Sequence, residues 1–182
     1  MTAVAEFSIV VETFNHTELG DTGRLRGSLG AAVEIAARGG EVLCADAAGS
    51  PALAALLAEF PGVRRVDAAG LGYDEAKRRA ARHASARYIL YLDGDCLPEP
   101  GWLEALLAPL RSGRADATGG FTRYDSGFLA SVLTIMDFGF LLPRRERILE
   151  CYASNNSGFR RELLLAAPAP DGPASATLTP NC

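Results

Sequence analysis

An apolar run ends in a charged triplet at Tyr88-Ile89-Leu90-Tyr91-Leu92-Asp93-Gly94-Asp95. Residues 87–92 predict a central strand of a sheet, because side chains on both alternating faces of the run are apolar. The triplet Asp93-Gly94-Asp95 follows at the carboxyl end of this strand. Ligands of open α/β sheets bind at that edge, so the triplet is the first candidate for a functional site.

Similar apolar runs precede this strand, and helical patterns lie on both sides of it. Short apolar runs predict further strands at 7–11, 41–45 and 63–66. The alternation of strands and helices with short connections predicts an α/β fold: a mostly parallel, Rossmann-like sheet with helices on both faces. Apolar residues recur at helical spacing and predict helices at 25–36, at 51–60 and from about Glu99 to Leu110, and residues 74–85 predict a charged helix.

The pattern is less regular after Asp116. It predicts a strand at 117–124, a helix at 128–142, an extended segment at 149–154 and a helix at 160–167, followed by a loop or frayed end at 168–182. The helix at 128–142 is the most apolar part of the chain, but it is shorter than the roughly 20 residues that span a bilayer. We expect a buried core helix there, with a helix on a membrane surface as the alternative.

Composition narrows the class of protein. The chain has 182 residues, of which 48% are hydrophobic and 22% charged, as in one globular domain with a full core. Its net charge of −4 argues against nucleic acid as a partner and suits a divalent cation. Four scattered cysteines and two histidines argue against a zinc site and favour reduced thiols in the cytoplasm. Residues 1–6 lack the features of a secretory signal.

The triplet itself has two interpretations. Two carboxylates separated by one glycine can present oxygens to a hard cation such as Mg²⁺ or Mn²⁺, which takes few protein ligands and completes its shell with substrate phosphates. The alternative is an ordinary turn in which Asp95 is a polar cap. The triplet alone does not distinguish these two interpretations.

Five segments in order resemble family 2 glycosyltransferases of the GT-A fold, over about residues 6–167. Besides the central strand and its triplet, they include a first strand with a Thr-aromatic-Asn turn, a second strand ending in an aspartate, a helix start and a Phe-Arg-Arg segment. These segments are 88–95 with Pro98 and Trp102-Leu103, Phe7–Asn15, Glu41–Asp46 with Gly49-Ser50, Gly72-Tyr73 with Ala76–Arg78, and Asn155–Arg161.

The resemblance implies an inverting transferase that moves a sugar from a nucleotide-diphosphate sugar to the hydroxyl of a glycan or lipid-linked acceptor. The protein would work in the cytoplasm, with possible contact to the inner face of the membrane. Within one domain, 1–182, it implies a nucleotide-binding part at about 6–112 and the start of an acceptor part at 113–167. It further implies a Mn²⁺ or Mg²⁺ ion bound by Asp95 with help from Asp93.

The resemblance also implies roles for single residues, and each has a bland alternative. Asp46 would bind the base of the nucleotide, or else only initiate a loop. Thr13 would line the base and ribose pocket, or else be an ordinary strand-end threonine. Lys77 would pair with the diphosphate, or else belong to a solvated basic face. The remaining implied residues are Asp93 at the ribose or the metal, and Asn155 and Asn156 in the acceptor-side segment.

The sequence departs from the family pattern in several places. Glu12 replaces a usual proline, and Ala47-Ala48 replace a second acidic residue. Lys77 replaces an arginine, which removes two-pronged contact with phosphate, and Arg78 replaces an asparagine. These departures bear on which nucleotide is bound more than on the fold.

The general base that deprotonates the acceptor hydroxyl is not identified. Inverting members use an aspartate beyond the Phe-Arg-Arg segment, and after Arg161 the chain has only Glu162 and Asp171 as acidic residues. Asp171 resembles a turn residue, so we expect a chain that stops short of the base. It would be either a fragment of an active enzyme or a catalytically inactive protein that binds a nucleotide or a partner.

A nucleotidyltransferase is disfavoured, because no Gly-rich basic loop follows the first strand.

Overall fold

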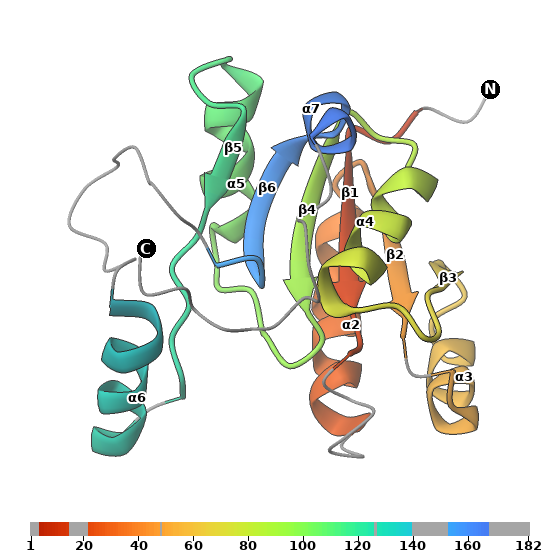
Figure 1. Cartoon of the computed structure of the whole chain (residues 1–182), viewed down its shortest axis with the longest axis horizontal. Coiled ribbons are helices and arrows are strands. Elements are labelled where there is room, and N and C mark those ends of the chain that lie inside the picture. The colour runs from red at the N-terminus through yellow and green to blue at the C-terminus, as the bar shows by residue number, and fades with distance from the viewer. Residues whose placement is uncertain (1–3, 15–21, 48, 126, 140–152, 168–182) are drawn as a thin grey trace.

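The computed structural model describes residues 4–14, 22–47, 49–125, 127–139 and 153–167. They form a six-stranded sheet with helices packed on both faces (Figure 1). The strands are β1 (Phe7–Glu12), β2 (Gly40–Asp46), β3 (Val63–Asp67), β4 (Tyr88–Asp93), β5 (Ala117–Gly119) and β6 (Asn156–Arg160). The helices are α2 (Thr22–Ala36), α3 (Pro51–Ala58), α4 (Tyr73–His83), α5 (Trp102–Arg111), α6 (Phe128–Phe138) and α7 (Arg161–Ala166).

The strand order is β3-β2-β1-β4-β6-β5. Strands β3, β2, β1 and β4 are parallel, β6 runs antiparallel to β4, and β5 runs antiparallel to β6. From β1 the chain first extends the sheet through β2 and β3 and then returns to add β4 on the other side. The carboxyl ends of β1 and β4 therefore flank a topological switch point, where α/β sheets bind their ligands.

Alternate side chains of β1 enter two separate cores, as the strand period of two requires. Phe7, Ile9 and Val11 pack in the core that contains the leucines of α2, α3 and α5. Val10 packs in the second core with the alanines of α4, and leucines of α7 pack against that core. The predicted mostly parallel sheet with helices on both faces is confirmed.

The sheet departs from prediction at its antiparallel edge. The expected strand at 117–124 is only Ala117–Gly119, and the strand that pairs with it, β6, was not predicted. Of the extended segment expected at 149–154, residues 149–152 lie outside the described ranges, and residues 153–154 are not strand. Because β6 contains Asn, Ser and Gly rather than an apolar run, its sequence carries no strand signal.

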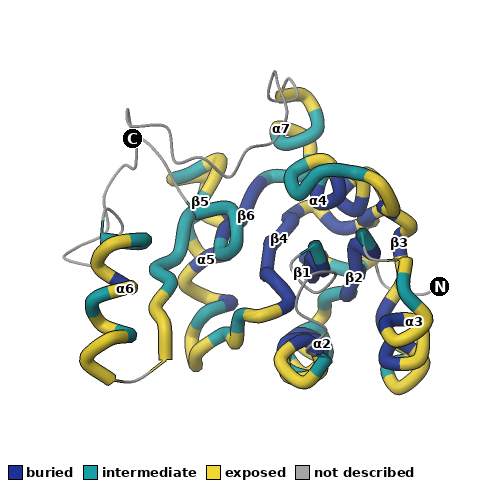
Figure 2. Tube along the Cα trace, turned by 60° about the horizontal axis from the view of Figure 1, so that its bottom comes forward, coloured by how far each residue is buried: buried dark blue, intermediate teal, exposed yellow. Residues whose placement is uncertain are grey.

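Helix α6 is not the buried core helix that the sequence predicts. Thr134 is its only buried residue among those described, and Phe128 and Met136 are 87% and 72% exposed. The helix stands apart from the sheet (Figures 1 and 2). No described helix is long and apolar enough to cross a membrane. Contact of α6 with a membrane surface stays a prediction.

Candidate functional site

Three acidic residues, of which Asp46 and Asp93 are predicted site residues and Glu12 is not, lie at the carboxyl ends of the parallel strands. Glu12 ends β1, Asp46 ends β2 and Asp93 ends β4. Glu12 and Asp93 are register partners in neighbouring strands, so their side chains lie on the same face of the sheet at the switch point. The three carboxyl groups are buried.

The backbone after β4 is fixed by contacts with β1 and α2. The Gly94 amide donates to the carbonyl of Glu12 at 2.9 Å, which ties the triplet to β1. Ser28, fully buried on α2, places its hydroxyl 2.9 Å from the carbonyl of Gly94 and 2.6 Å from that of Cys96. Ser28 is not among the residues predicted from the sequence. Its only signal is a hydroxyl on the apolar face of a helix, one turn from Leu25.

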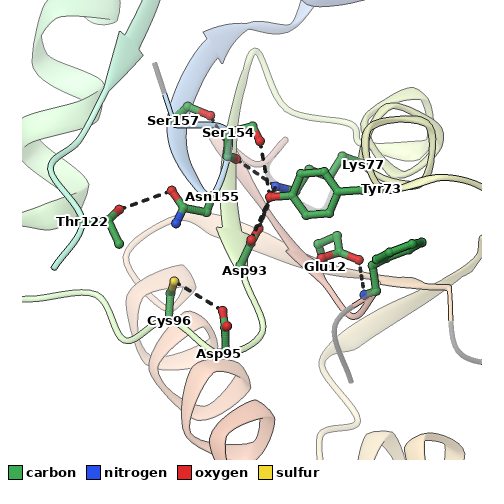
Figure 3. Close-up of polar contacts among 11 residues, drawn as sticks. Glu12, Tyr73, Lys77, Asp93, Asp95, Cys96, Thr122, Ser154, Asn155 and Ser157 are labelled. Atoms are coloured by element: carbon green, nitrogen blue, oxygen red, sulfur yellow. Dashed lines mark hydrogen bonds and ion pairs between the residues drawn. The ribbon is translucent and has the colours of Figure 1, made fainter. Parts of the chain in front are cut away.

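The two carboxylates of the triplet have different surroundings. Asp93 is buried and points toward Tyr73 and Lys77, whereas Asp95 is exposed and lies beside Cys96 (Figure 3). The Tyr73 hydroxyl lies 2.7 Å from Asp93 Oδ2, and Lys77 Nζ lies 2.6 Å from Asp93 Oδ1. Across the described residues, no three His, Cys, Asp or Glu side chains are placed to hold a metal ion together. A cation here would rely on Asp95 and on oxygens of a ligand, which fits the coordination habits of Mg²⁺.

Lys77 is inside the protein, so the alternative of a solvated basic face is wrong for this residue. It is 1% exposed, and its ammonium donates to the carbonyl of Ser154 at 2.9 Å and to the hydroxyl of Tyr73. Arg79 and Arg82, on the same helix, are exposed and do form such a face. Tyr73 belongs to the segment that resembles the family's helix start, and the sequence predicts no role for its hydroxyl.

Glu12 is a buried carboxyl whose pKa lies well above its ordinary value. Burial raises the pKa of Glu12 to about 8; the negative charge of Asp93 adds to this rise, and the positive charge of Lys77 opposes it. The amide of Phe14 donates to the Glu12 carboxyl. Glu12, which replaces the family's proline, thus places beside Asp93 on the neighbouring strand a carboxyl whose pKa is about 8.

Thr13 and Asp46 are buried and hydrogen-bonded to neighbouring elements. The Thr13 hydroxyl donates to the carbonyl of Ala45 at 2.9 Å, which joins the ends of β1 and β2. Asp46 accepts from the amide of Gly49 at 2.7 Å, as a loop-initiating aspartate does, and from Arg65 of β3 at 2.6 Å. Sequence reasoning missed Arg65, whose signal is only a polar residue between Val63 and Val66 of a strand.

The two asparagines of the acceptor-side segment separate into two environments. Asn155 is at the site: its carbonyl accepts from the amide of Asp93 at 3.3 Å. Asn156 joins α5 to the chain after β5, because its side chain accepts from Trp102 Nε1 at 2.8 Å and donates to the carbonyl of Phe121 at 3.0 Å. The structure therefore brings Asn155, but not the side chain of Asn156, next to the triplet.

Glu162 is far from this site. It lies in the first turn of α7, which follows β6. Because β6 runs opposite to β4, α7 lies at the other edge of the sheet, where the parallel strands begin (Figure 1). The neighbouring Arg161 amide accordingly bonds the carbonyl of Arg87, at the start of β4. Asp171 lies outside the described residues.

Residues 8–165 match the family described as Glycosyl transferase family 2. The chain belongs to this family. No curated protein matches the sequence of this glycosyltransferase family member. The match begins in β1, one residue after Phe7, contains β2 to β6 completely and ends in α7.

Solved structures share the fold of this family 2 chain. The mannosyltransferase PcManGT from Pyrobaculum calidifontis, in complex with GDP-Man and Mn²⁺, has a TM-score of 0.64 at 20% identity, over 90% of this chain and 46% of that one. Mannosyl-3-phosphoglycerate synthase from Rubrobacter xylanophilus has a TM-score of 0.58 at 17% identity, over 87% of this chain and 55% of that one. Glucosyl-3-phosphoglycerate synthase from Mycobacterium tuberculosis, in complex with UDP, has a TM-score of 0.54 at 19% identity, over 87% and 58%.

These similarities confirm the GT-A-like, Rossmann-like fold. The chain spans about half the length of these three proteins.

Proposed function

We propose that this chain binds a nucleotide-diphosphate sugar at the carboxyl ends of β1, β2 and β4 and transfers the sugar, with inversion, to an acceptor hydroxyl on a glycan or lipid-linked molecule. The observation that carries the proposal is the placement of Asp93 and Asp95 at the switch point between β1 and β4. Polar groups at this edge of an α/β sheet form the usual ligand site.

In this proposal the two aspartates of the triplet have different roles. Asp95, exposed at the end of β4, binds Mn²⁺ or Mg²⁺ together with the diphosphate. When bound, the ion would supply positive charge to the departing diphosphate. Asp93, held by Tyr73 and Lys77, faces the ribose.

Three other residues complete the proposed nucleotide and acceptor sites. Asp46 and Thr13 bind the base of the nucleotide, and Asp46 either gives up its contact with Arg65 or keeps it beside the base. Asn155, whose carbonyl is bonded to Asp93, borders the acceptor side. In this proposal the part at about 6–112 binds the nucleotide and the part at 113–167 begins the acceptor site, with Asn156 supporting the latter.

Two of the similar structures support the chemistry of the proposal. PcManGT is described in complex with GDP-Man and Mn²⁺, and the Mycobacterium tuberculosis synthase in complex with UDP. Both share the fold of this chain, and their descriptions name the ligand classes proposed here, a nucleotide diphosphate or its sugar and a divalent metal.

Titration calorimetry with UDP-sugars and GDP-sugars tests the proposal. We expect one nucleotide class to bind with Mn²⁺ present and more weakly after the metal is removed. Asp95→Ala should lose this dependence on the metal, and Asp116→Ala, which removes an exposed carboxylate just before β5, is its matched control and should keep it. The absence of metal-dependent binding to either class would overturn the proposal.

A second candidate function is nucleotide binding without turnover. The observation that favours it is the position of Glu162, which lies at the opposite edge of the sheet from the triplet. A sugar-release assay with the nucleotide sugar that binds separates the two candidates. Binding with no release of nucleotide diphosphate, with or without a glycan acceptor, favours the silent form, and metal-dependent release favours the enzyme.

A further inference from the structure

The ammonium group of Lys77 is surrounded by partners within the protein. An ammonium group has three protons; Lys77 Nζ donates to the carbonyl of Ser154 at 2.9 Å and to the hydroxyl of Tyr73, and it forms an ion pair with Asp93 Oδ1 at 2.6 Å. Nζ also lies 3.8 Å from the centroid of the Tyr73 ring. Because Lys77 is 1% exposed, a phosphate oxygen could reach it only by displacing a partner from an enclosed position.

The contacts of the Tyr73 hydroxyl determine which group receives its proton. A phenol has one proton and two acceptor positions. Lys77 Nζ donates to this oxygen, and so does Ser154 Oγ at 3.3 Å. The Tyr73 proton is therefore directed to Asp93, whose Oδ2 is 2.7 Å away. The hydrogen bonds run from Lys77 through Tyr73 to Asp93 (Figure 3), an arrangement in which each bond strengthens the next.

Asp93 keeps acceptor capacity for a ligand. The two oxygens of a carboxylate accept about four hydrogen bonds, of which Tyr73 and Lys77 use two. Tyr73 and Lys77 are four residues apart on α4, so they lie on the same face of that helix and reach Asp93 together. These contacts thus fix the orientation of the Asp93 carboxylate and leave acceptor positions on it for a ligand.

We propose that Tyr73 and Lys77 are positioning residues that act on the bound nucleotide through Asp93, and that Lys77 does not contact the diphosphate. This inference rests on the proposed function, because it takes the nucleotide to bind at Asp93. It replaces the diphosphate contact that the family resemblance implies for Lys77, and it gives Tyr73 a role in the site.

Comparison of monophosphate and diphosphate affinities tests the inference. The probes are UDP and UMP, or GDP and GMP, chosen by which diphosphate the wild type binds, with Mn²⁺ at a constant concentration. We expect Tyr73→Phe and Lys77→Met each to weaken both probes by about tenfold, as the loss of a hydrogen bond to a charged group does. The ratio of the two affinities should stay within about twofold of the wild type.

Two matched controls isolate the network. Arg79→Met also removes one positive charge from α4, but at an exposed position. Tyr88→Phe removes a phenol hydroxyl from the start of β4, at the far end of the strand from Asp93. Neither control should change either affinity by more than about twofold. Tyr73→Phe keeps the ring and its edge contact with Phe14, so it remains informative where Lys77→Met fails to fold by circular dichroism.

The outcomes separate the inference from the function on which it rests. A Lys77→Met variant that loses at least about tenfold more affinity for the diphosphate than for the monophosphate would place Lys77 at the diphosphate and overturn the inference. Unchanged affinities in Tyr73→Phe would also overturn it. Wild-type protein that binds neither UDP nor GDP with Mn²⁺ would instead overturn the proposed function, and the inference with it.

Discussion

At the scale of single residues, the buried carboxyls of the site differ in how their charge is balanced. Asp46 has Arg65 as a partner at 2.6 Å, and Asp93 has Lys77 at the same distance. Glu12 lies next to the Asp93–Lys77 pair, and burial together with the charge of Asp93 raises its pKa to about 8. Because Glu12 is protonated at neutral pH, the charges of the pair beside it are the positive charge of Lys77 and the negative charge of Asp93.

Glu12 should make the protein less stable as the pH rises. Its pKa in the folded protein, about 8, exceeds the ordinary 4.5, so the folded state binds the proton more tightly than the unfolded state. The resulting stability is fully present below about pH 4.5 and is lost as the pH rises through about 8, with a slope of at most about 1.4 kcal/mol per unit.

Urea unfolding of wild type and Glu12→Gln at a series of pH values measures this effect. We expect the stability of the variant, relative to wild type, to increase between about pH 5 and 8. Glu59→Gln, at a half-exposed position on the surface, is the control and should follow the wild-type profile. A constant difference between Glu12→Gln and wild type across this range would contradict the account of Glu12.

Ser28 should stabilise the backbone of the triplet. Ser28→Ala removes the hydroxyl that contacts the carbonyls of Gly94 and Cys96, and we expect a loss of about 1–3 kcal/mol in the free energy of unfolding. Ser131→Ala is the matched control, since its hydroxyl bonds a carbonyl of its own exposed helix, and it should change stability by under about 0.5 kcal/mol. Equal losses in the two variants would argue against this role of Ser28.

The sequence identified some of these residues but not their partners. The triplet and Lys77 stand out because charged residues follow an apolar strand or match a family motif. Tyr73, Ser28 and Arg65 do not, because their roles come from contacts between elements distant in the chain. The same limit explains why the sequence could not decide whether Lys77 was solvated or buried.

At the scale of elements, prediction succeeded where the apolar pattern is periodic. Strands β1, β2, β3 and β4 and helices α2 to α5 lie close to their predicted positions, because each buries a run or stripe of apolar side chains. Strand β6 was not predicted because its residues are mostly polar. The burial predicted for α6 was wrong because its apolar side chains are exposed.

Gly158 of β6 should be intolerant of any side chain. A Cβ added there would lie 2.7 Å from Thr118 Oγ1 and 2.9 Å from Leu90 Cδ2, too close for either contact. We expect Gly158→Ala to cost about 1–3 kcal/mol of stability through this crowding. Thermal or urea unfolding measures the loss.

Gly30 of α2 provides the matched comparison for Gly158. A Cβ at Gly30 meets nothing within 4 Å, and alanine favours a helix over glycine by about 0.5–1 kcal/mol. Gly30→Ala should therefore stabilise the protein. If Gly158→Ala is as stable as Gly30→Ala, the close approach of β5, β6 and β4 described here is wrong.

At the scale of the whole molecule, topology brings the site together. The reversal of strand order at β1 puts Glu12 and Asp93 on neighbouring strand ends, and α4 closes over them with Tyr73 and Lys77. Asn155 lies at the same edge, just before the antiparallel strand β6, and β6 then leads the chain to Glu162 at the opposite edge. The sequence predicted the parallel half of this arrangement. The antiparallel half could not be read from residues with no apolar period.

The central claim is that Asp95 binds the metal that accompanies a nucleotide diphosphate. Titration calorimetry of wild type and Asp95→Ala, with and without Mn²⁺, tests it with the diphosphate that wild type binds. We predict that Mn²⁺ tightens binding to the wild type at least about tenfold and leaves binding to Asp95→Ala within about twofold of its metal-free value. An equal gain from Mn²⁺ in both proteins would contradict this account.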